Sequence, residues 1–210
     1  MFSTLLVVTG LAVWQRENIE AKVLAEVYDR ETLSDRLDQV RQENQEQLEQ
    51  KGVTVPALTQ KQMDRLLRGK LTEEKALSKL DLDQYSSDDS AADALNHCVA
   101  ELYRYEARLY AQLGEIRQNA INTLHSYPKS ERTRSLKHDI KMDAVSACYA
   151  LEVEADNQVS AIIAEYRVKV ADLGGDPEDV DSLWGVYCSE KKSVKAYYFN
   201  LLQHKEDKSQ

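Results

Sequence analysis

The stretch from Ala91 to Leu173 decides the fold, because it carries two long apolar stripes separated by the turn sequence His125-Ser126-Tyr127-Pro128-Lys129-Ser130. Before the turn, apolar or small residues recur at helical spacing: Leu95, Val99, Leu102, Leu109, Leu113, Ile116 and Ala120. After the turn, the stripe is Leu136, Ile140, Ala144, Cys148, Leu151, Ala155, Val159, Ile162, Tyr166, Val170 and Leu173. This spacing keeps one face of each helix apolar. Helices this long need to bury such a stripe, so we expect an antiparallel hairpin.

A third helix is predicted after the hairpin. Gly174 is suited to end the second arm, Asp176 to cap the next helix, and Pro177 to occupy its first position. The residues expected on its apolar side are Val180, Leu183, Trp184, Tyr187, Val194, Tyr198, Leu201 and Leu202. The sequence therefore predicts an all-α fold with a three-helix, coiled-coil-like bundle over residues 91–204, followed by a disordered tail at 205–210.

Composition and charge agree with a helical protein and argue against a nucleic-acid partner. Seven Gly and three Pro leave little material for the turns of an all-β fold, and charged residues make up 30% of the chain. The 27 basic and 36 acidic residues give a net charge of −9. Since phosphate backbones repel an acidic chain, we expect no nucleic-acid binding.

Four segments precede the bundle. Residues 1–14 are apolar, and residues 15–51 predict a polar helical spacer with helices near 17–30 and 33–50, the second capped by Thr32 or Ser34. Its run from Gln39 to Leu48 is nearly all polar, which is typical of a solvated helix. Residues 52–80 predict a short helix pair capped by Thr59 and Thr72. Residues 81–90 are acidic and Ser-rich, which favours a linker whose end, at Asp89 or Ser90, caps the first long helix.

The first segment has three interpretations. Phe2 to Trp14 contains no charge and is short for a membrane-spanning helix, but its length suits a signal-peptide core or an interfacial anchor. No Lys or Arg precedes it, so a start codon placed inside a longer gene also fits. The third interpretation is an apolar helix that packs on the rest of the protein.

A basic patch surrounds the hairpin turn. Lys129, Arg132, Arg134, Lys137 and Lys141 outnumber Glu131 and Asp139 there. Basic side chains at a helix start oppose the helix dipole, so the patch is either a solvated helix start or a docking surface for an acidic partner. We take these five residues as the candidate partner-binding site.

The three cysteines do not predict a disulfide scaffold or a zinc site, because no two lie close in the sequence. A hairpin turning near Pro128 separates Cys98 from Cys148 by about 15 Å along the helix axis, too far to bond. A third helix brings Cys188 to within about 6 Å of the level of Cys98. Cys98 and Cys188 are thus the candidate disulfide or close pair, and the alternative is that all three are small buried hydrophobes.

Motifs for chemistry are missing from the sequence. The residues three before His97, His125, His138 and His204 are not acidic, so the di-metal pattern of helical bundles is not met. Asp93 and His97, at i and i+4, predict a surface pair. There is no nucleophile elbow, phosphate loop or Cys/His arrangement. We therefore expect no enzyme activity, no cofactor, no metal and no small-molecule substrate.

Two stretches carry a family resemblance. Val53-Thr54-Val55-Pro56 followed by Leu58 to Leu77, and Tyr127-Pro128-Lys129-Ser130-Glu131-Arg132-Thr133, resemble uncharacterised helical proteins of Gram-positive bacteria with an N-terminal anchor or signal. The resemblance covers about a third of the chain and implies an extracytoplasmic helical module. The expected function is a non-enzymatic, membrane-tethered or exported interaction or scaffold protein of the cell envelope. The alternative is a cytosolic coiled-coil adaptor that forms homo- or hetero-oligomers.

Overall fold

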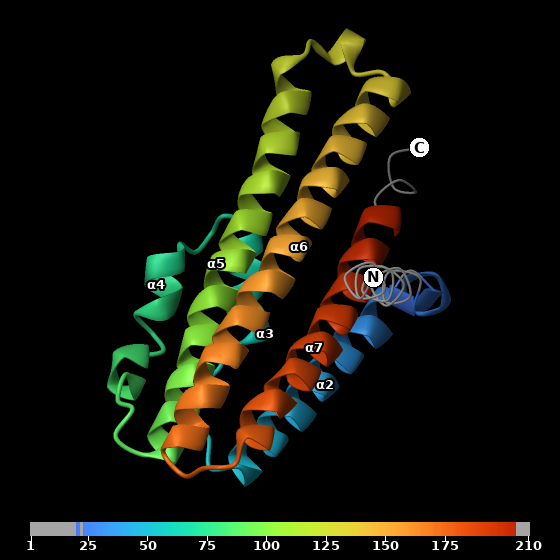
Figure 1. Ribbon diagram of the computed structural model, residues 1–210. Helices are drawn as coiled ribbons and strands as arrows, with labels where there is room; N and C mark the ends of the chain where they lie inside the picture. The colour runs from blue at the N-terminus through green and yellow to red at the C-terminus, as the bar shows by residue number, and fades with distance from the viewer. Residues whose placement is uncertain (1–19, 22, 205–210) are drawn as a thin grey trace, which may run out of the picture. The chain divides into compact units, whose positions relative to one another are not determined.

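The chain folds into α-helices (Figure 1), as expected. The structure, a computed structural model, describes residues 20–21 and 23–204, and over these ranges the regular elements are all helical. The predicted segment 1–14 and the tail at 205–210 lie outside the described residues. The chain divides into two compact units, one of residues 52–181 and one that combines residues 1–51 with 182–210. The predicted bundle over 91–204 spans both units, and its boundaries stay a prediction.

The unit of residues 52–181 is built on the predicted helical hairpin. Helix α5 (Ala91–Ser126) leads through a short 3-10 helix, η2 (Lys129–Glu131), into α6 (Arg134–Asp172), and the two long helices lie side by side along their length (Figure 1). Ser90 caps α5 by accepting the amide of Asp93 at 3.1 Å, and Thr133 caps α6 by accepting that of Leu136 at 3.2 Å. The hairpin, its turn and the Ser90 cap are confirmed.

Full burial is confined to the part of the hairpin away from the turn. The buried residues of α5 are Ala94, Leu95, Cys98, Val99, Ala100, Tyr105, Ala107, Tyr110 and Gly114. Those of α6 are Leu151, Ala155, Val159, Ile163, Tyr166 and Val170. From residue 115 to residue 150, side chains are half-buried or exposed. We call residues 115–150 the distal arms, and they contain two helical segments packed on each other without a fully buried core.

The predicted stripes are partly wrong in detail. Ile163 is buried and its neighbour Ile162 only half-buried, while Leu173 is 42% exposed. In α5, Tyr105 and Tyr110 occupy the core, and the predicted Leu102 and Leu109 are half-buried. Tyr105 lies toward α6, where burial, helped by the carboxylates of Glu154 and Asp156, raises the pKa of its hydroxyl.

Three short elements cover α5: α3 (Gln60–Leu67), α4 (Glu73–Leu77) and the 3-10 helix η1 (Leu82–Tyr85). The caps of the helix pair are confirmed, with Thr59 and Gln62 forming a capping box and Thr72 accepting the amide of Lys75. Gly114 allows α3 to approach α5, because a Cβ there would lie 2.7 Å from the carbonyl oxygen of Leu66.

The second unit contains α2 (Arg30–Gln50) and α7 (Pro177–His204) from Ser182 onward. Its core is the cluster of Ala21, Leu33, Leu37, Ala196 and Tyr197. The cap of α2 is Asp29, which accepts the amide of Thr32 at 2.8 Å, so the predicted caps Thr32 and Ser34 are wrong. Helix α7 begins at Pro177 as predicted, with the Asp176 carboxylate accepting the amide of Glu178 at 2.9 Å.

The polar run of α2 has a buried side, contrary to the expected solvated helix. Asn44 and Leu48 are 8% and 3% exposed. The side chain of Asn44 donates to the carbonyl of Val186 at 3.4 Å and accepts from the hydroxyl of Ser189 at 3.1 Å. Arg41 pairs with Glu190 at 2.6 Å, and Lys192 pairs with Glu20. This face thus combines the buried side chain of Leu48 with hydrogen bonds and an ion pair to α7.

The helices of the described residues do not include a candidate membrane span, since each is too short or too polar.

Candidate functional site

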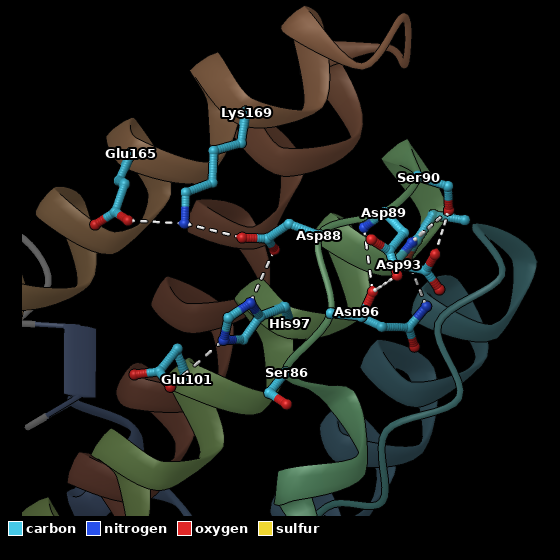
Figure 2. A network of polar contacts seen from close by, with 12 residues as sticks. Ser86, Asp88, Asp89, Ser90, Asp93, Asn96, His97, Glu101, Glu165 and Lys169 are labelled. Atoms are coloured by element: carbon cyan, nitrogen blue, oxygen red, sulfur yellow. Dashed lines mark hydrogen bonds and ion pairs between the residues drawn. The ribbon is translucent and has the colours of Figure 1, made fainter.

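A cluster of charged side chains joins the segment before α5 to both arms of the hairpin (Figure 2). Asp88 lies between the arms: its Oδ1 is 2.8 Å from Nδ1 of His97 on α5, and its Oδ2 is 3.2 Å from Nζ of Lys169 on α6. Lys169 also bonds to Glu165 at 3.0 Å, and Glu101 Oε1 lies 3.9 Å from Nε2 of His97. We call these five residues, Asp88, His97, Glu101, Glu165 and Lys169, the Asp88 cluster.

The electrostatics of the cluster keep Asp88 and Lys169 charged. Burial by itself would raise the pKa of Asp88, but the hydrogen bonds from His97 and Lys169 outweigh it and hold the pKa below its ordinary value. The hydrogen bond to Glu165, together with that to Asp88, raises the pKa of Lys169. Since the Asp88 carboxylate is a hydrogen-bond acceptor, Nδ1 of His97 carries the proton that it donates.

Aromatic and thiol groups line the inner side of the cluster. The His97 ring meets the Tyr166 ring edge-on at 5.1 Å, and Nζ of Lys169 lies 4.2 Å from the Tyr166 ring centroid. Burial raises the pKa of Tyr166 to about 12. Burial, with the nearby carboxylates of Glu101 and Glu165, also raises the pKa of Cys98 to about 12. The Cys98 thiol is therefore protonated at neutral pH and a poor nucleophile.

The Asp88 cluster orients a histidine in the way that a catalytic base is oriented, but its five residues do not include a nucleophile beside that histidine. A carboxylate on Nδ1 is what orients a histidine base, but the described neighbour of Nε2 is another carboxylate, Glu101. The hydroxyl of Ser86, also drawn in Figure 2, donates to the carbonyl of Asp83 at 2.8 Å. What this geometry can do is hold residues 86–90 on both helices at once.

A second set of polar contacts fixes the segment before α3. The side-chain oxygen of Asn96 accepts the amide of Thr54 at 2.8 Å, and Tyr85 donates to the carbonyl of Thr54 at 2.9 Å. Val53 and Val55, on either side, are buried. The residues expected to form an acidic linker, 81–90, thus contribute a helical turn and several contacts to the unit.

The Asp88 cluster was not predicted from the sequence. The i and i+4 spacing predicted that His97 pairs with Asp93 on the same helix, but Asp93 accepts from the hydroxyl of Ser90 at 2.6 Å and His97 pairs with Asp88. A local signal did point away from the pairing of Asp93 with His97. Asp93 is the third residue after the Ser90 cap, and a side chain at that position bonds to the cap residue. The partner Lys169 is 81 residues from Asp88, and the sequence carried no signal for that contact.

The predicted basic site lies at the turn of the hairpin, and one of its members has a structural role. Arg132 donates from Nε to the carbonyl of Tyr127 at 3.0 Å and from Nη2 to that of His125 at 3.2 Å. It therefore satisfies carbonyls at the end of α5. Lys129, Arg134 and Lys137 are exposed, and Lys141 is half-buried.

A shallow hollow of about 410 Å³ on α3 is a second basic feature, which the sequence did not single out. It is lined by Gln60, Lys61, Asp64, Arg65, Arg68 and Lys70. The available signal was four basic residues within ten positions. Its cations are exposed, and the hollow also holds the carboxylate of Asp64.

All three cysteines are free thiols. Cys98 is buried, while Cys148 and Cys188 are half-buried. Cys98 and Cys188 belong to different compact units, so their proposed proximity stays a prediction.

In the described ranges, no three or more His, Cys, Asp or Glu side chains are grouped so as to hold a metal ion. Comparisons with protein-family models, with curated proteins and with solved structures gave no match.

Proposed function

We propose that this chain is a non-enzymatic helical interaction or scaffold protein, and that the distal arms of the α5–α6 hairpin are the element that contacts an acidic protein partner. The observation that supports this is the absence of full burial from residue 115 to residue 150. Ordering a residue costs about 1–2 kcal/mol of conformational entropy, which packing must offset. Long arms that add no buried core are more simply explained by a contact outside the chain.

The charge of the arms gives the chemistry of that partner. Residues 117–141 contain six basic and two acidic residues and so carry +4, whereas the whole chain carries −9. The remaining residues therefore carry −13. A positive end on an acidic protein attracts negative surfaces and repels positive ones, which sets the orientation of an encounter.

The test is binding of a fluorescent poly-glutamate peptide, followed by anisotropy at low salt. We call Lys129, Arg134 and Lys137, the exposed basic residues at the turn of the hairpin, the tip. Reversing these three charges together (K129E, R134E and K137E) should weaken binding about ten-fold or more. The matched control reverses three exposed charges on and just after α3 (K61E, R68E and K70E), which changes the net charge equally. Equal weakening by both sets, or no binding by the parent protein, would contradict the proposal.

The location that we propose is the cell envelope, with residues 1–14 as the tether or export signal. The support is the uncharged sequence from Phe2 to Trp14. Fractionation of cells that express the tagged native gene tests this location. Recovery in the membrane or outside the cell supports it, and purely cytosolic recovery favours the coiled-coil adaptor instead.

A further inference from the structure

Helix α6 has a second apolar stripe that does not face α5. Met142, Val145, Tyr149 and Val153 follow one another at steps of three, four and four, the spacing of a single helix face. At 3.6 residues per turn this stripe lies roughly 145° around the helix from the stripe of Ile140, Ala144, Cys148, Leu151 and Ala155. Met142 and Val153 are 49% and 50% exposed, and Val145 and Tyr149 are half-buried. The hairpin therefore has an apolar face beyond the one that it uses internally.

Charge changes sign along the same helix, on either side of this stripe. Residues 134–141 contain three basic residues and one acidic residue, for a charge of +2. Residues 152–156 contain three acidic residues and no basic ones, for a charge of −3. An apolar stripe between a positive and a negative segment is complementary to a copy of itself turned end for end.

We infer that the second apolar stripe of α6 is a self-association surface, on which α6 of a second copy of this chain packs in the antiparallel direction. Two copies that cross near residue 147 place Val145 opposite Tyr149 of the second copy, and Met142 near its Val153. In the same crossing, Lys141 of one copy and Glu152 of the second copy differ in height along the helix axis by roughly one residue, or about 1.5 Å. Each contact occurs twice, because the interface has two-fold symmetry.

The parallel alternative is disfavoured by the same charges. Parallel copies in register would place Lys141 level with Lys141 of the second copy and Glu152 level with its Glu152. Like charges held close across a helix interface repel each other. The inference rests on the proposed function only in taking the hairpin as the interaction element, and it names a second copy as an additional partner.

The experiment is sedimentation equilibrium of the full chain over a wide concentration range, at low and at high salt. The substitutions Met142→Glu and Val153→Glu, made singly, should raise the dimer dissociation constant about ten-fold or more. The matched control is Val168→Glu, because Val168 is also on α6 and is 58% exposed but lies roughly 95° from the stripe. Circular dichroism of each variant checks that the monomer fold is kept.

The direction of packing is tested by exchanging charges. Either K141E or E152K alone places like charges opposite each other in the antiparallel dimer and should weaken it. The double variant K141E/E152K restores opposite charges and should recover association. Any of three results would overturn the inference. These are a parent chain that stays monomeric, a dimer whose dissociation constant neither stripe substitution changes, and a double variant that associates as weakly as the single variants.

These results are separable from those on the proposed function. If poly-glutamate binding depends on the tip while the chain is monomeric, the self-association surface is wrong and the acidic-partner proposal stands. If the dimer forms as expected while tip reversal leaves peptide binding unchanged, the acidic-partner proposal is wrong and the self-association surface stands.

Discussion

Single residues control how closely the short elements approach the hairpin. Gly114 lies under α3, and a side chain there would meet backbone atoms, which cannot rotate away as a flexible side chain can. Asp88 bonds to both arms of the hairpin, so its charge state bears on how residues 86–90 are held.

The substitution Gly114→Ala should destabilise the protein. The new Cβ would lie 2.7 Å from the carbonyl oxygen of Leu66 and 3.2 Å from that of Leu67, so α3 must shift. Overpacking of this kind costs about 1–3 kcal/mol, against up to about 1 kcal/mol gained from the better helix former. Urea unfolding measures the difference. Gly185→Ala on α7 is the control, because nothing lies within 4 Å of its Cβ and stability should rise.

The substitution Asp88→Asn should flatten the acid side of the stability profile. The pKa of Asp88 is lower in the folded protein, so its charge contributes stability above the unfolded value of about 3.9. That contribution is lost as the pH falls through the lower folded pKa. Urea midpoints from neutral pH downward test this, with Asp139→Asn removing an exposed carboxylate elsewhere for comparison. A steep acid loss that is identical in the parent protein and in the Asp88→Asn variant would contradict the assignment.

At the scale of elements, local signals predicted more than contacts between distant segments did. The capping box of Thr59, the Ser90 cap and the start of α7 at Pro177 follow from residues within a few positions of each other. The Asp88 cluster, by contrast, needs side chains that only the folded hairpin brings together. The buried Asn44 was missed because a polar residue in a polar run looks exposed until its partner on α7 is known.

The turn between α5 and α6 should depend on Arg132. Its guanidinium bonds to the carbonyls of Tyr127 and His125 at the exposed turn, where a hydrogen bond contributes a net of about 0.5–1.5 kcal/mol. In Arg132→Ala, amides around the turn should exchange faster in hydrogen–deuterium exchange, while those near Val99 and Val159 keep their protection. Exposed Arg134→Ala is the matched control. Equal protection of the turn in both variants would exclude this capping role.

At the scale of the whole molecule, the two compact units have different kinds of cores. Residues 52–181 bury apolar residues of α3, α5 and α6, whereas the described part of the other unit combines a small apolar cluster with ion pairs such as Arg41 with Glu190. The all-α class and the hairpin follow from periodicity alone. The division into units did not follow, because α7 is one continuous pattern in sequence that contributes to both.

The chain of residues 52–181 should fold by itself. It contains the hairpin, its caps and the short elements that cover α5, and it forms one compact unit with the buried residues of both long helices. We expect a helical spectrum and a single cooperative thermal transition, measured by circular dichroism. The complementary outcome, a helical but non-cooperative melt, would show that this unit needs the rest of the chain.

The lack of full burial between residues 115 and 150 also affects which insertions and deletions the chain can accept during evolution. Seven residues make nearly two helical turns, so loss of one heptad from each arm keeps the apolar stripes aligned. Such a paired deletion retracts the turn by about 10 Å and leaves the core intact. The reach of the hairpin is thus a quantity that insertions and deletions can adjust, like the length of a spacer, at little cost to the fold.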